Sequence, residues 1–219
     1  MMPYRAVLFD LDGTLLDTLD GLADAMNRVL ARSGYPTHDR SSYRYFVGNG
    51  LRNTVWSALP PEARDDTTFA QCFDAMQREY SRCWPDQTKP YPGIPELIAE
   101  LQQRGLILTI LSNKIDEWTQ QMASHYFAPG TFSLIFGERA HVPRKPDPSG
   151  ALEIADRLQI PPEQFLYLGD TRTDMETATT SGMVAVGVTW GFRPAEELKR
   201  YGARHLIDHP LELLQLLPR

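Results

Sequence analysis

The fold of this chain is decided near its start, by the stretch Ala6-Val7-Leu8-Phe9-Asp10-Leu11-Asp12-Gly13-Thr14. A short and nearly continuous apolar run is typical of a strand that is buried on both faces of a parallel sheet. Two carboxylates follow at the carboxyl end of this strand, which is the edge where open α/β sheets bind ligands. Gly13 allows a tight turn there, and Thr14 offers a hydroxyl and an N–H. Such acids can bind a hard cation or divide nucleophilic and acid–base work, although turn-forming aspartates have the same pattern.

Composition and charge exclude several classes of protein. The chain has 219 residues, 42% of them hydrophobic, with no apolar run long enough to cross a bilayer. Its net charge of −6 and its scattered basic residues argue against a nucleic acid partner. Cys72 and Cys83 lack the spacing of a metal site or a disulfide framework, as in proteins of reducing compartments. Since no signal segment precedes the first strand, we expect a cytoplasmic protein.

Strand and helix patterns alternate along most of the chain. The further strand-like runs are 106–111, 132–136, 165–168 and 183–188, with an edge strand near 205–207. One helix is expected over 95–104, because it starts with a proline and a glycine follows it. A second helix should open at Asp147-Pro148 and turn four residues toward the core, namely Leu152, Ile154, Ala155 and Leu158. The alternation predicts an α/β fold with a Rossmann-like, doubly wound parallel sheet.

Residues 17–89 interrupt this alternation with helical patterns only. Apolar residues recur there at helical spacing in two stripes: Leu19, Leu22, Ala23, Met26, Val29 and Leu30, and then Phe69, Phe73, Met76 and Tyr80. The segment ends in Lys89-Pro90-Tyr91-Pro92-Gly93, which is typical of a linker. We therefore expect a small all-helical cap of residues 17–89, inserted after the first strand into a core of residues 1–16 and 90–219, and covering the ligand-binding crevice.

Three later segments also carry polar chemistry at strand ends. Ser112-Asn113-Lys114 follows a strand and can hold a phosphate oxygen, although it also suits a turn or a helix cap. Lys145 stands among prolines before a helix. An ammonium held there is a good partner for phosphate, although a solvated surface lysine has the same pattern. Gly169-Asp170-Thr171-Arg172-Thr173-Asp174 opens another helix. Thr171 and Asp174 have the spacing of a capping box, which leaves Asp170 unexplained.

Together, these four segments resemble the motifs of the haloacid dehalogenase superfamily of phosphohydrolases. In that family an Asp-x-Asp-Gly-Thr motif, a hydroxyl residue, a lysine and an acidic motif follow in this order, as they do here at 10–14, Ser112, Lys145 and 169–174. The resemblance covers essentially the whole chain, and the inserted helices are similar to the family's cap. Three further segments, 47–50, 91–93 and 187–191, resemble the phosphoglycolate phosphatase-like branch, many of whose members have Thr in place of Ser112.

The resemblance implies a phosphatase that acts through an aspartyl-phosphate. In this scheme Asp10 attacks the phosphorus, and Asp12 protonates the leaving alcohol and then activates water. Mg²⁺ would be held by the carboxylates of Asp10 and Asp170 and by the main-chain carbonyl of Asp12, with Asp174 acting through water. The remaining phosphoryl oxygens would be bound by Ser112, Lys145 and the groups around Gly13, Thr14 and Asn113.

Substrate selectivity is expected to come from the cap. Asn49, between two glycines, and the nearby Arg52 could bind an anionic leaving group such as that of phosphoglycolate. The same residues also suit a glycine hinge with a solvated arginine. The oligomeric state and the physiological substrate do not follow from the sequence.

Other functions stay open or fail on the residues present. A phosphomutase or a phosphonatase would use the same Asp10 chemistry, and a non-catalytic regulator would retain the fold without turnover. A dinucleotide-binding protein is excluded because no Gly-x-Gly-x-x-Gly follows the first strand. His205 and His209 lack a third ligand for zinc.

Overall fold

The computed structural model describes residues 4–217, which separate into two compact units. One unit runs to Leu16 and resumes at Pro90, and the other is Asp17–Lys89. The connections between them pair as two short strands, β2 (Leu16–Asp17) and β3 (Lys89–Pro90).

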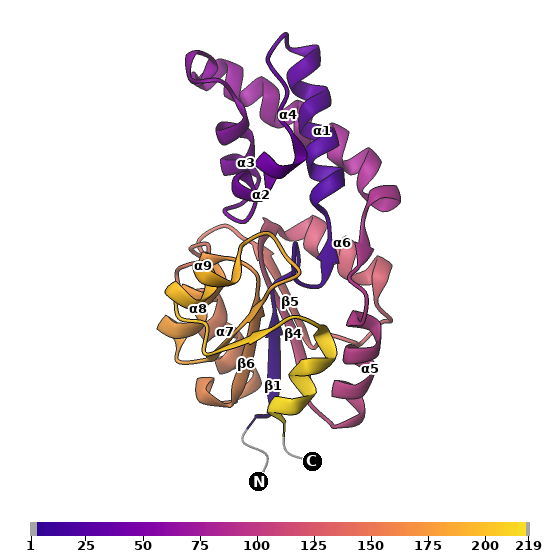
Figure 1. Ribbon diagram of the computed structural model, residues 1–219, viewed down its shortest axis with the longest axis vertical. Coiled ribbons are helices and arrows are strands. Elements are labelled where there is room, and N and C mark those ends of the chain that lie inside the picture. The colour runs from indigo at the N-terminus through magenta and orange to yellow at the C-terminus, as the bar shows by residue number, and fades with distance from the viewer. Residues whose placement is uncertain (1–3, 218–219) are drawn as a thin grey trace. The chain divides into compact units, whose positions relative to one another are not determined.

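The first unit is built on a six-stranded sheet (Figure 1). Its strands are β1 (Ala6–Phe9), β4 (Ile107–Ile115), β5 (Leu134–Glu138), β6 (Phe165–Gly169), β7 (Val184–Val188) and β8 (His205–Ile207). The spatial order is β5-β4-β1-β6-β7-β8, and each neighbouring pair is parallel. The chain moves outward from β1 to β5 and then continues on the other side of β1, so the strand order reverses at β1. The predicted doubly wound parallel sheet is confirmed.

Helices cover both faces of this sheet, as Figure 1 shows. On one face lie α5 (Ile94–Gln103) and α6 (Asp116–Tyr126), and on the other lie α7 (Ser149–Leu158), α8 (Arg172–Ser181) and α9 (Ala195–Arg200). Two 3₁₀ segments, Pro162–Gln164 and Pro210–Leu216, complete the unit. All four residues of β1 are fully buried, as expected for a strand that is covered on both sides. The central strand therefore delivers Asp10 from a rigid, dry core.

Two details of the core differ from the sequence-based expectation. Ser112, Asn113 and Lys114 lie inside β4 and are buried, where we expected a loop after the strand. The strand continues because β4 shifts register between Leu111 and Ile115 and then pairs with β5 again. Polar residues in a buried strand give no local sign of such an irregularity.

The second difference concerns α7. Leu152 is 42% exposed, so its predicted place in the core is wrong. The helix begins at Ser149 and buries Gly150, Ala151, Ile154 and Ala155, which recur at three- and four-residue spacing and form one stripe. Leu152 falls outside that stripe.

The second unit contains only helices beyond its connecting strands. These are α1 (Leu19–Arg32), α2 (Arg40–Phe46), α3 (Leu51–Ala58) and α4 (Asp66–Gln87), with a short 3₁₀ turn at Pro61–Ala63. Buried residues on α1 and α4 include Met26, Leu30, Met76 and Tyr80, in agreement with the two apolar stripes. Among the helices formed by residues 4–217, none combines the length and the apolar character that a membrane span requires.

Candidate active site

The turn after β1 packs closely against a later acidic residue. Gly13 has a φ of +87°, and its N–H donates to the carbonyl of Leu16 at 2.9 Å. A Cβ atom at Gly13 would lie 2.3 Å from Asp170 Oδ2, so both the backbone angle and the space require glycine. The first and the fourth sequence motifs therefore meet at this turn.

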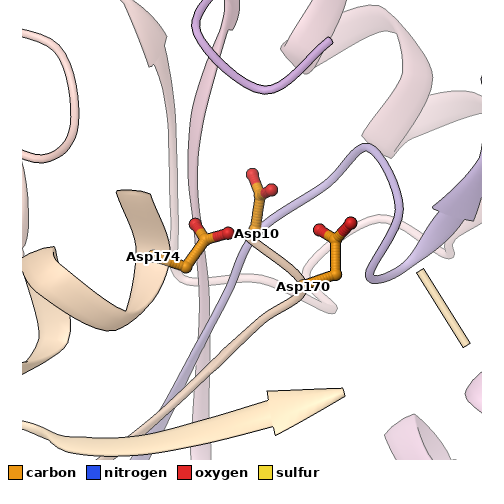
Figure 2. Close-up of side chains that lie close together, drawn as sticks. All are labelled: Asp10, Asp170 and Asp174. Carbon is orange, nitrogen blue, oxygen red and sulfur yellow. The ribbon is translucent and has the colours of Figure 1, made fainter. Parts of the chain in front are cut away.

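Three buried carboxylates converge at the carboxyl ends of the central strands (Figure 2). Asp10 follows β1, Asp170 follows β6, and Asp174 lies in the first turn of α8. Each offers an oxygen, and these oxygens lie within 4.8 Å of one another. Burial and the neighbouring Asp174 raise the pKa of Asp10 to about 7, and the same effects raise the pKa of Asp170 well above its usual range. An all-oxygen set of crowded acids fits a hard divalent cation such as Mg²⁺, which would stabilise their charged forms.

Asp170 is held from two sides. Its Oδ1 accepts a hydrogen bond from the Thr14 hydroxyl at 3.2 Å, and its Oδ2 accepts one from the Phe192 N–H at 2.7 Å. Each carboxylate oxygen has a further lone pair with which it can bind a cation. These two contacts fix the orientation of the Asp170 carboxylate.

Asp174 is fully buried and is engaged through both of its oxygens. Oδ2 accepts hydrogen bonds from the Thr171 N–H at 3.0 Å and from the Thr171 hydroxyl at 2.6 Å, and the predicted capping box of α8 is present. Oδ1 accepts hydrogen bonds from Lys145 Nζ at 2.7 Å and from the Tyr167 hydroxyl at 3.4 Å. Both oxygens of Asp174 are therefore engaged by hydrogen bonds, and its Oδ1 contact orients the ammonium of Lys145.

Lys145 joins the acids to the strand beside them. Its Nζ lies 2.8 Å from Asp10 Oδ1 and donates to the carbonyl of Leu111 at 3.0 Å, in addition to its contact with Asp174. Burial alone would lower the pKa of Lys145, but the Asp10 and Asp174 carboxylates raise it well above its ordinary value. The ammonium is therefore charged and fixed beside the carboxylate of Asp10.

Asn113 fixes the backbone that carries this lysine. Its side-chain amide donates to the Lys145 carbonyl at 3.0 Å and accepts from the Lys145 N–H at 2.9 Å. We expected the main-chain N–H groups around Asn113 to bind phosphate. No local pattern indicated that its side chain bridges to a residue 32 positions later. Ser112, directly before it, is also buried, and its Oγ accepts a hydrogen bond from the Lys114 N–H at 3.2 Å.

Lys114 also belongs to this site, although no sequence motif assigned it a role. Its Nζ lies 3.0 Å from both Oδ1 and Oδ2 of Asp12. The contact between Lys114 and Asp12 follows from the proximity of two strand ends, because β4 and β1 are adjacent and Ile110 pairs with Phe9. That pairing was not predicted, so the contact could not be derived.

Asn49 and Arg52 belong to the helical unit. Asn49 is exposed and lies between Gly48 and Gly50, which have φ values of +112° and +84°. The guanidinium of Arg52 lies 4.7 Å from the ring centre of Phe69 and 5.4 Å from that of Phe73, both on α4. Arg52 thus has cation–π partners within its own unit.

Comparisons with known proteins agree with this geometry. Residues 7–188 match the family model described as haloacid dehalogenase-like hydrolase. An N-acetylmuramic acid 6-phosphate phosphatase from Pseudomonas aeruginosa is 32% identical, with 100% of this chain and 96% of the relative covered. A phosphoglycolate phosphatase from Pseudomonas putida is 28% identical over 98% of this chain and 79% of its own length.

Solved structures extend the likeness to the whole fold. A crystal structure from Lactobacillus delbrueckii subsp. bulgaricus, provisionally named a phosphoglycolate phosphatase, has a TM-score of 0.90 and 29% identity and covers 98% of both chains. The family match runs from Val7 in β1 to the end of β7 and includes all three residues of the acidic cluster. This chain is an enzyme that belongs to the haloacid dehalogenase-like hydrolases.

Proposed function

We propose that this protein is a Mg²⁺-dependent phosphatase that hydrolyses a small, carboxylate-bearing phosphate monoester through an aspartyl-phosphate on Asp10. The observation that carries the proposal is the buried contact between Asp10 and Lys145 beside a cluster of further acids. A nucleophilic carboxylate needs such a cation, because it must approach a phosphate dianion.

The charges of the site support a divalent metal cofactor. Four aspartates (Asp10, Asp12, Asp170 and Asp174) face two lysines (Lys114 and Lys145), which leaves two negative charges when all six groups are ionised. We assign Mg²⁺ to Asp10, Asp170 and the main-chain carbonyl of Asp12, with Asp174 acting indirectly. When bound, Mg²⁺ would neutralise part of the charge that repels the substrate.

The chain's own residues then divide the chemistry. Asp10 attacks phosphorus, while Asp12 gives a proton to the leaving alcohol and afterwards takes one from the attacking water. Lys145 keeps its ammonium beside Asp10, and the hydroxyls of Ser112 and Thr14 and the N–H groups near Gly13 and Asn113 are proposed to bind phosphoryl oxygens.

The proposed substrate class rests on the names of the relatives and on the helical unit. Both named substrates, phosphoglycolate and N-acetylmuramic acid 6-phosphate, combine a phosphate with a carboxylic acid. Asn49 and Arg52 are the proposed groups that bind this carboxylate. The muramic acid relative has the higher identity to this chain and the more similar length, so an amino-sugar 6-phosphate that bears a carboxylate is the second candidate.

A substrate panel tests the proposal. The purified protein would be assayed with Mg²⁺ on phosphoglycolate, N-acetylmuramic acid 6-phosphate and N-acetylglucosamine 6-phosphate, which lacks the lactyl carboxylate. Preference for the acid-bearing member of the sugar pair supports the class, and equal rates contradict it. Isomerisation of glucose 1-phosphate, or cleavage of a phosphonate, would instead identify a mutase or a phosphonatase.

We place this activity in the cytoplasm. Cys72 and Cys83 are both buried free thiols, as is common in a reducing compartment.

A further inference from the structure

The ammonium of Lys114 and the carboxylate of Asp12 form a separate ion pair within the acidic site. Both Asp12 oxygens lie 3.0 Å from Lys114 Nζ. The Lys114 side chain is only 4% exposed, whereas that of Asp12 is 13% exposed. The carboxylate of Asp12 thus meets solvent on one side and a buried cation on the other.

The two lysines of the site serve different aspartates of the first motif. Lys145, which precedes α7, contacts Asp10, and Lys114, inside β4, contacts Asp12. Asp10 and Asp12 are only two positions apart, yet each carboxylate has a cationic partner of its own. Holding both oxygens also restricts rotation of the Asp12 carboxylate about its terminal bond.

Stability alone is a weak reason for this pair. Removing two charges from water costs several kcal/mol per ion, and the attraction between them often only offsets that cost. A buried lysine beside a reacting group is better explained by the orientation that it imposes.

We propose that Lys114 is a positioning residue for Asp12, holding that carboxylate where it transfers protons to and from the reacting oxygens. The inference rests on the proposed phosphatase function. In the first step the bond from phosphorus to the leaving oxygen breaks, the bond to Asp10 forms, and the proton of Asp12 moves to the leaving oxygen. In the second step water attacks phosphorus, the bond to Asp10 breaks, and a proton of the water returns to Asp12.

Leaving groups of different basicity separate this role from a structural one. An alkoxide needs the proton of Asp12 to leave, whereas 4-nitrophenolate leaves without it. We therefore compare Lys114→Met with the wild type on phosphoglycolate, or the best alkyl monoester of the panel, and on 4-nitrophenyl phosphate. Rapid mixing would resolve release of the first product from steady-state turnover.

For Lys114→Met we expect the first-product rate on the alkyl monoester to fall about 10- to 100-fold, part of the usual contribution of general acid catalysis. The first-product rate on 4-nitrophenyl phosphate should change less than threefold or so, followed by slow turnover because the second step still needs Asp12. The substrate concentration that half-saturates the first-product rate and the Mg²⁺ concentration for half-maximal rate should both stay near wild-type values. Lys114→Arg should recover part of the lost rate, since it keeps the charge.

Controls separate the pair from general damage. Lys199→Met removes an exposed lysine on α9 and should behave as wild type. In an Asp12→Asn background, Lys114→Met should cause little further loss, because the residue through which it acts is already absent. The melting temperature of each variant would show whether the fold is retained.

The outcomes are distinct. Equal losses of the first-product rate on both substrates, a change confined to KM, or full additivity with Asp12→Asn would overturn the role of Lys114 and leave the phosphatase proposal intact. A wild-type protein that hydrolyses no phosphate monoester would overturn both.

Discussion

The main-chain N–H of Phe192 donates a 2.7 Å hydrogen bond to Oδ2 of Asp170, which ties the loop after β7 to the acidic cluster. Within the same loop, the indole N–H of Trp190 donates to the carbonyl of Thr14 at 3.0 Å. Gly191 lies between these two contacts, and a Cβ atom there would lie 2.3 Å from the Cβ of Asp170 and 2.5 Å from the carbonyl oxygen of Gly13. The loop therefore fixes the proposed metal ligand and the first-motif turn at once.

Gly191→Ala should displace Asp170 and weaken Mg²⁺ binding. We expect the Mg²⁺ concentration for half-maximal activity to rise by about 10- to 100-fold, the usual effect of losing support for a metal ligand. Titration calorimetry with Mg²⁺ gives the same quantity without turnover. Gly21→Ala is the matched control, since its Cβ would meet nothing closer than 3.5 Å. Unchanged Mg²⁺ affinity in Gly191→Ala would mean that the loop after β7 shifts to make room for the methyl group while Asp170 stays in place.

Metal removal should abolish activity reversibly. We expect no turnover in EDTA, full recovery with Mg²⁺, and inhibition by Ca²⁺, because the larger ion prefers longer and more numerous oxygen contacts. Asp170→Ala should raise the Mg²⁺ requirement or eliminate turnover. Rate measurements over a range of Mg²⁺ concentrations check both statements, and wild-type behaviour of Asp170→Ala at limiting Mg²⁺ would contradict its assignment as a ligand.

Asp10→Asn should eliminate turnover while the fold is retained, because the amide is nearly isosteric but is not a nucleophile. Acid-quenched samples should contain phosphoprotein for the wild type and none for the variant. Substantial residual kcat would remove Asp10 from its proposed role.

The same substitution should change the pH dependence of stability. Burial, followed by Asp174, raises the pKa of Asp10 from 3.8 to about 7, so the folded state favours the protonated form. This contribution to stability is complete at a pH below the pKa of Asp10 in the unfolded chain. It is lost as the pH rises through the pKa of Asp10 in the folded protein. In EDTA, the melting temperature of the wild type should therefore fall between pH 4 and about 7, and Asp10→Asn should reduce that fall. If the melting temperatures of both proteins changed with pH in the same way, the raised pKa of Asp10 would be contradicted.

Arg52→Ala tests the proposed anion-binding role of the helical unit. Loss of one charge-assisted contact should lower kcat/KM on carboxylate-bearing substrates by about 10- to 100-fold and should change hydrolysis of 4-nitrophenyl phosphate much less. Equal losses on both substrates, together with a lower melting temperature, would show that Arg52 acts through its stacking on Phe69 and Phe73.

The sheet and its acidic residues could be predicted because their signals are local. The run before Asp10, the turn at Gly13 and the capping box of Thr171 and Asp174 each lie within a few residues, and all three are present. Contacts between distant segments leave no such signal. The pairing of Lys114 with Asp12 spans 102 positions and depends on the register of β4 against β1.

The side-chain amide of Asn113 forms hydrogen bonds with both the N–H and the C=O of Lys145, as the backbone of a neighbouring strand would. Because Asn113 lies in β4, the sheet determines the position of Lys145, and the segment that precedes the lysine does not. A change in the length or the sequence of the connection between β5 and Lys145 should therefore leave the ammonium at the same point beside Asp10.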